Sequence, residues 1–204
     1  MKRLPLLYLF FLLLSCNKET ILEQGTVRGT VRDKTTNEGI SGATVYLLSH
    51  IPTGGFGGGG GSTQINFTTS NTDGSFSFQL DYDSELAYTC AATHDLYFDY
   101  GDEFPVPEEI KVGENVEVNL QPKAWLRVHC VNSEPFNDSD YFNVSWNSEG
   151  PFYGSTIDTT LLSIIEGNIN IHITWYVTKN SFANSYTQEI YCPAFDTTYY
   201  EIFY

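Results

Sequence analysis

Basic residues are scarce in this chain, and their scarcity excludes one large class of function. Ten Lys and Arg residues stand against 25 Asp and Glu residues, for a formal net charge of −15 at pH 7. Binding to nucleic acid needs a basic surface that neutralises phosphates, so no nucleic-acid partner is expected. An anionic lipid surface would also repel such a chain.

A sustained helical pattern is missing as well, and methionine occurs only once. Val, Ile, Thr, Tyr and Phe dominate instead, and these residues favour strands over helices. Several segments alternate apolar and polar residues, as residues 27–32 do. The sequence therefore predicts an all-β protein.

The first long apolar run, residues 4–14, follows the basic pair Lys2 and Arg3. A basic start before about a dozen apolar residues is typical of a secretion signal, and the run is too short to span a bilayer. Its ending, Leu13-Leu14-Ser15-Cys16, resembles the bacterial lipobox, in which the cysteine is lipidated and becomes the new N-terminus. The resemblance implies a lipoprotein signal peptide over 1–15 and lipidation of Cys16. A signal peptide cut elsewhere and a signal anchor are the alternatives.

Lipidation would determine where the protein works. Each buried acyl CH₂ contributes about 0.8 kcal/mol, so several chains on one residue anchor a protein stably. Loss of Lys2 and Arg3 would make the charge about −17, so the lipid must do the anchoring. Residues 16–25 then form a lipidated tether in the cell envelope. We expect the outer membrane, with the chain periplasmic or exposed at the surface.

Residues 26–122 are predicted to form a first β-sandwich of seven strands that closes near Pro122. Its elements are Gly29-Thr30-Val31-Arg32-Asp33, residues 39–45, residues 72–78 and residues 116–120. An Asp-Gly pair at 73–74 predicts a hairpin there. In this order the elements resemble the carboxypeptidase regulatory-like domain, which implies a prealbumin-like sandwich. The Gly-rich loop that includes residues 54–61 is longer than is usual in that family.

Residues 123–204 lie outside this resemblance and are predicted to form a second, smaller sandwich, immunoglobulin-like or similar. The clearest strand covers residues 168–178, where Ile, Trp and Val alternate with polar residues. Almost no linker separates the two sandwiches, so we expect them to pack closely at residues 122–125.

Three cysteines remain after lipidation, and two of them could form a disulfide. Cys130 and Cys192 both fall on predicted inward faces, with Trp146 inward between them. The arrangement resembles the immunoglobulin bridge packed against a Trp, although Tyr191 is one residue too close to Cys192. A bridge would add about 2–4 kcal/mol. Two buried free thiols are the alternative, and Cys90 is expected to be a core thiol.

Aromatic side chains gather between strands at Tyr97, Phe98 and Tyr100, where a sandwich places loops. Rings on a rigid scaffold can stack on sugar faces while nearby polar groups bind hydroxyls. These three residues are therefore the candidate glycan-binding site. Rings in such a place can equally cover the edge of a core or pack against the neighbouring domain.

Two Asp-Thr-Thr segments, at Thr159 and Thr197, resemble the acceptor of bacterial O-glycosylation systems. The four His residues are scattered, so no metal site is expected, and no catalytic set or cofactor-binding motif is found. We predict a non-enzymatic envelope lipoprotein that acts as a binding or accessory module, with an envelope protein or glycan as partner. The alternative is a carbohydrate-binding surface lipoprotein that serves a neighbouring transporter or hydrolase.

Overall fold

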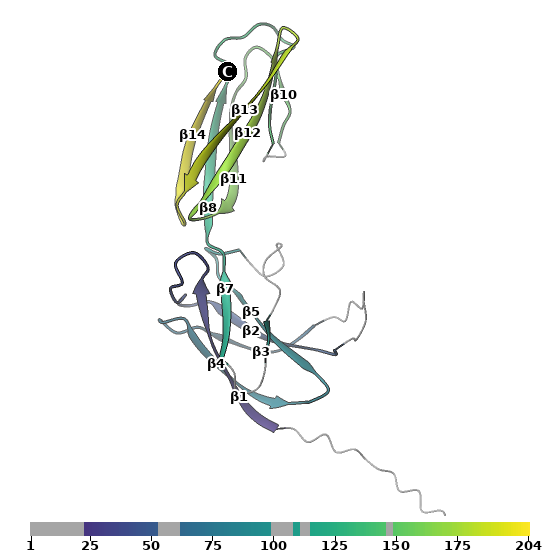
Figure 1. The fold of residues 1–204 in the computed structure, drawn as a ribbon, viewed down its shortest axis with the longest axis vertical. Helices are drawn as coiled ribbons and strands as arrows, with labels where there is room; N and C mark the ends of the chain where they lie inside the picture. The colour runs from purple at the N-terminus through teal and green to yellow at the C-terminus, as the bar shows by residue number, and fades with distance from the viewer. Residues whose placement is uncertain (1–22, 53–61, 99–107, 111–114, 146–148) are drawn as a thin grey trace, which may run out of the picture.

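The computed structural model describes residues 23–52, 62–98, 108–110, 115–145 and 149–204. The regular structure in these ranges is β-strand, and the strands form two sandwiches placed end to end (Figure 1). The all-β fold with two tandem sandwiches that the sequence predicts is confirmed. No helix in the described ranges is long and apolar enough to cross a membrane.

The first sandwich packs a three-stranded sheet, in the order β4-β1-β7, against a four-stranded sheet, in the order β3-β2-β5-β6. The first strand pairs antiparallel with the fourth and parallel with the seventh. This is the seven-stranded, prealbumin-like sandwich that the resemblance implies. Its strands are β1 (Glu23–Asp33), β2 (Thr44–His50), β3 (Thr63–Thr69), β4 (Ser75–Tyr82), β5 (Ala87–Thr93), β6 (Glu108–Glu109) and β7 (Asn115–Leu120).

The second sandwich repeats this arrangement strand for strand. Its sheets have the orders β11-β8-β14 and β10-β9-β12-β13, and β8 again pairs antiparallel with one neighbour and parallel with the last strand. The order differs from the immunoglobulin one, in which the second strand belongs to the sheet of the first. The strands are β8 (Lys123–Val131), β9 (Tyr141–Val144), β10 (Phe152–Tyr153), β11 (Asp158–Glu166), β12 (Ile169–Lys179), β13 (Phe182–Cys192) and β14 (Thr197–Phe203).

Alternating apolar residues build the two cores, as the pattern predicts. Val27 and Val31 of β1 and Phe76 and Phe78 of β4 are buried in the first sandwich. The buried residues fall into two clusters, one within 27–120 and the other within 124–202. A division into two domains at residue 122 agrees with these clusters and stays a prediction.

The turn at Asp73-Gly74 differs from its prediction. Gly74 has the positive φ of 82° that such turns favour, and its N–H donates to Asn71 O at 2.9 Å. The flanking strands β3 and β4 belong to different sheets, so the turn crosses from one layer to the other. The predicted hairpin is therefore wrong. An Asp-Gly pair predicts the turn itself, whereas the pairing of the strands depends on the rest of the sandwich.

Buried carboxylates hold the corresponding loop of each sandwich, between its first two strands. Asp33 accepts hydrogen bonds from Thr35 N (2.7 Å) and Thr36 N (3.0 Å), and Asp140 accepts from Phe136 N (2.8 Å) and Asn137 N (3.2 Å). Burial by itself would raise the pKa of each carboxyl, but the hydrogen bonds hold both pKa values below the ordinary 3.8. Their stabilisation is thus present at neutral pH and is lost as the pH falls through these lowered pKa values.

The junction between the sandwiches is short and hydrogen-bonded. Only Gln121 and Pro122 separate β7 from β8. The buried Gln121 side chain donates to Gly167 O at 3.2 Å, and Gly167 N donates to Pro122 O at 2.7 Å. Lys123 contributes both backbone groups, since its N–H donates to Leu96 O and its carbonyl accepts from Phe195 N. The two sandwiches are therefore packed against each other at residues 121–123.

A substitution at Gly29 tests the packing of the first sandwich. A Cβ at this β1 position would collide with Val116 O and with the ring of Phe76. We expect Gly29→Ala to lower the free energy of unfolding by about 1–3 kcal/mol, because the core must shift to make room. Urea unfolding at pH 7 measures the loss. Ser77→Ala, at an exposed position of β4, is the control and should change stability by less than about 0.5 kcal/mol. Equal stability of the Gly29 variant and wild type would contradict the packing.

Candidate binding surface

Tyr97 and Phe98 do not form an open sugar-stacking site. Tyr97 is only 7% exposed, its hydroxyl donates to Asp33 Oδ2 at 3.1 Å, and its ring meets Phe195 edge to face at 5.3 Å. Burial, together with the charge of Asp33, raises the pKa of Tyr97. The half-buried Phe98 ring lies under Lys123 Nζ at 5.8 Å. The alternative of packing against the neighbouring sandwich is the one the structure shows, and Tyr100 lies outside the described residues.

The Cys130–Cys192 bridge is not formed. Cys90, Cys130 and Cys192 are all free and buried. Cys130 and Cys192 do both point into the core, so the prediction that each lies on the inward face of its strand is confirmed. Burial raises the pKa of the Cys90 and Cys130 thiols to about 12, and it raises the pKa of Cys192 as well.

Depth in the sandwich explains why the two sulfurs do not meet. Cys130 lies near the far end of β8 and pairs with Ile202 of β14. Cys192 lies near the junction, where its carbonyl accepts from Asn168 N and its thiol lies beside Thr198. Thr198 and Ile202 are four residues apart on β14, a rise of about 13 Å. A disulfide needs Cα atoms within about 7 Å, so the geometry excludes it.

The predicted modification sites are only partly described. Thr159 and Thr197 are half-buried at the starts of β11 and β14, and their glycosylation stays a prediction. Cys16 and Trp146 lie outside the described residues. Within the described part of the chain, no three His, Cys, Asp or Glu side chains gather closely enough to hold a metal ion.

An exposed apolar surface covers the outer side of the β11-β8-β14 sheet. Ile164 of β11 pairs with Trp125 of β8, and in the next row Leu162, Arg127 and Tyr199 lie side by side on β11, β8 and β14. Ile164 is 55% exposed, Leu162 50% and Tyr199 68%. We call Trp125, Leu162, Ile164 and Tyr199 the apolar face. The outward-facing side of a sheet in a β-sandwich is normally polar, so this face departs from the rule.

One charged side chain lies within the apolar face, and others border it on the side away from the junction. Arg127, between Leu162 and Tyr199, places its Cζ 5.7 Å from the centre of the Tyr199 ring, a cation–π contact. In the next row His129 Nε2 lies 2.7 Å from Asp158 Oδ1, and His129 Nδ1 lies 3.7 Å from Glu201 Oε1. The hydrogen bond with Asp158, with the charges of both carboxylates, raises the pKa of His129. Polar groups around an apolar centre are the usual plan of a protein interface.

Sequence patterns did not point to the apolar face because they did not point to β11. The segment Leu161-Leu162-Ser163-Ile164-Ile165 contains apolar pairs, which hide the alternation that marks a half-buried strand. In the structure Leu161 is buried, whereas Leu162 and Ile164 face solvent. The sequence did contain one signal for this face: residues 161–165 favour a strand and are apolar on both of its sides, so one apolar side is left for the solvent.

Comparison with known proteins gives a likeness of fold only. No family model matches the sequence, and no curated protein matches it. Among solved structures, the chain is similar to the TIE protein of Bacillus anthracis at 15% identity, with a TM-score of 0.36, over 88% of this chain and 34% of that one. The chain thus spans about a third of that protein's length.

Two further structures are similar over most of this chain. A DUF3823 family protein from Bacteroides uniformis matches at 12% identity and a TM-score of 0.33, over 84% of this chain and all of that one. A streptococcal ancillary pilin matches at 12% identity and a TM-score of 0.39, over 90% of this chain and 63% of that one.

A thiol count tests the correction at Cys130 and Cys192. For the chain from residue 17 onward, denatured in guanidinium without reductant, we expect three thiols per chain to react with Ellman's reagent. The folded chain should react far more slowly, because burial and the raised pKa values keep the thiols from forming thiolates. A count of one thiol, with two more released by a reductant, would contradict the free cysteines.

Proposed function

We propose that this protein is a non-enzymatic module of the bacterial cell envelope, anchored through lipid on Cys16. The observation that supports the proposal is the arrangement of the sandwiches. The strand β1 begins at the end of the molecule that faces away from the second sandwich (Figure 1). A lipid on Cys16, a few residues before β1, would therefore leave the second sandwich farthest from the membrane. The first sandwich would act as a spacer and the second as the part that meets a partner.

The partner that best fits the apolar face is another protein. Exposed apolar surface with a polar border marks protein-binding sites, and the aliphatic Leu162 and Ile164 are each at least half exposed. A sugar platform would rely on rings, whereas half of this face is aliphatic. Capture of a partner protein at the envelope, by this face, is the function we propose.

Metabolic labelling with palmitate tests the anchor. Wild type should incorporate the label and remain with membranes, and Cys16→Ser should lose the label, because the thiol is the site of acylation. Cys90→Ser, which removes a buried thiol, is the control and should keep the label. Equal labelling of wild type and Cys16→Ser would contradict the anchor.

Site-specific photo-crosslinking in intact cells tests the apolar face. A photoreactive residue at Leu162 should give one major adduct, since the partner covers this position. The same residue at Asn170, exposed on the opposite sheet, should give little or none. Ile164→Asp, in combination with the Leu162 probe, should reduce the adduct severalfold by placing a charge in the interface. Equal adducts at both positions, or none at Leu162, would overturn the assignment.

A further inference from the structure

A groove of about 540 Å³ lies on the outer side of the β4-β1-β7 sheet, in the first sandwich. Register places its floor residues in two rows, Ser77–Arg28–Asn115 and Ser75–Thr30–Glu117. Neighbouring strands are about 4.8 Å apart and successive rows about 7 Å apart. The two rows therefore cover roughly 10 by 7 Å. A site of this size accommodates one or two sugar rings.

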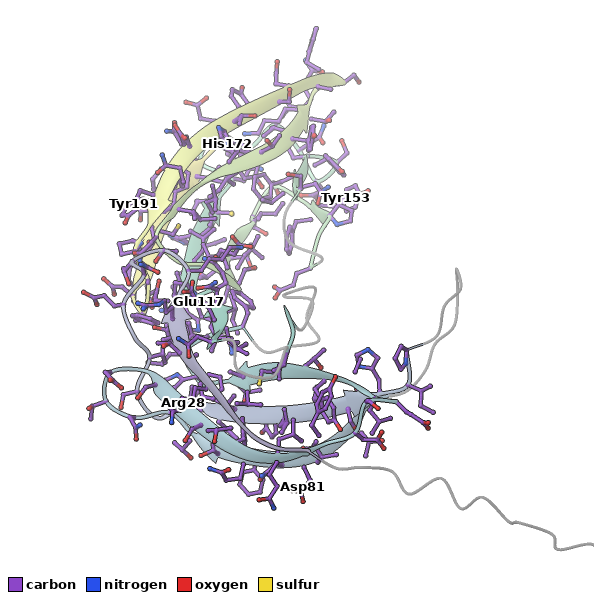
Figure 2. All side chains as sticks on the ribbon, turned by 60° about the horizontal axis from the view of Figure 1, so that its bottom comes forward. Arg28, Asp81, Glu117, Tyr153, His172 and Tyr191 are labelled. Carbon is purple, nitrogen blue, oxygen red and sulfur yellow. The ribbon has the colours of Figure 1, made fainter. Side chains whose placement is uncertain are left out.

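The groove is basic in a protein that is otherwise strongly acidic. Arg28 and Arg32 both line it, and Glu117 is the one acidic residue among its lining residues, all of which are described. Figure 2 labels Arg28 and Glu117, which come from β1 and β7. Two guanidinium groups against one carboxylate give the groove a local positive charge, in a chain whose net charge is −15.

The two arginines differ in what they already contact. Arg32 Nη1 donates to Asn37 O at 2.8 Å, and Arg32 Nε lies 3.4 Å from Glu117 Oε2, close enough for an ion pair but without hydrogen-bond geometry. Arg28 is exposed, and no described carboxylate pairs with it. The charge of Glu117 is thus matched by Arg32. The guanidinium of Arg28 remains as the group that an anion on the ligand would meet.

The other floor residues select for a ligand rich in hydroxyl groups. In the middle strand β1 the backbone groups already pair with β4 and β7, so a peptide could not add to the floor as a strand. Recognition must come from the hydroxyls of Thr30, Ser75 and Ser77 and from the carboxamide of Asn115, which can donate to and accept from sugar hydroxyls. A guanidinium binds a carboxylate through two parallel hydrogen bonds.

We propose that this groove binds an acidic saccharide, whose uronic-acid carboxylate is held by Arg28 and whose hydroxyls are held by Ser77 and Asn115. The site lies on the first sandwich, apart from the apolar face, and the proposal does not depend on a protein partner there. It also gives the first sandwich a role beyond that of a spacer.

Isothermal titration calorimetry on the chain from residue 17 onward tests the site. The probes are tetramers of galacturonate, glucuronate and mannuronate, together with the methyl ester of the galacturonate tetramer. At least one acidic tetramer should bind saturably and more weakly as salt is raised, whereas the uncharged ester should not bind. Arg28→Gln should weaken that binding by about tenfold or more, the usual effect of losing a charged hydrogen bond.

Arg127→Gln removes the same charge from an exposed position of the second sandwich and is the matched control. It should leave the affinity unchanged. The proposal is overturned if none of the three acidic tetramers binds, if Arg28→Gln binds as tightly as wild type, or if both variants lose affinity equally. Binding of the ester as tight as that of the acid would also overturn the carboxylate assignment.

Discussion

Parallel pairing between the first and last strands of each sandwich is the constraint on which the shape of this protein depends. The strand β1 runs parallel to β7, and β8 runs parallel to β14. A chain whose last strand runs in the direction of its first enters a sandwich at one end and leaves it at the other. Two such units in tandem must extend end to end, and the elongated molecule follows from that rule (Figure 1).

The junction at residues 121–123 fixes how the two sandwiches are placed relative to each other. With only two residues between β7 and β8, little freedom remains in the connection, and Gln121, Gly167 and Lys123 use their polar groups across it. Tyr97 and Phe195 add an aromatic contact from loops of the two sandwiches. Aromatic residues that in the sequence suggested ligand binding are therefore part of what joins the sandwiches.

The outer sides of the β4-β1-β7 and β11-β8-β14 sheets differ in the chemistry of their side chains. The outer sheet of the first sandwich carries hydroxyls and arginines, and the corresponding sheet of the second carries the apolar face. These two sheets have the same strand order, so the fold does not account for the difference. Side chains at outward positions, such as Arg28 in one sheet and Leu162 in the other, give the two sheets outer surfaces of different chemistry.

Alternation in the sequence was sufficient to determine the all-β class and the inward faces at Val27, Phe76 and Cys130. Local patterns carry this information because a strand buries every second residue. Only the tertiary structure decided which strands pair, that Cys130 and Cys192 lie at different depths, that Tyr97 is covered by Phe195, and that Leu162 faces solvent. Each of these depends on contacts between residues far apart in the chain. Alternation predicts which face of a strand a residue points to, but not how far along the sandwich it lies or which residue of the other sheet it contacts.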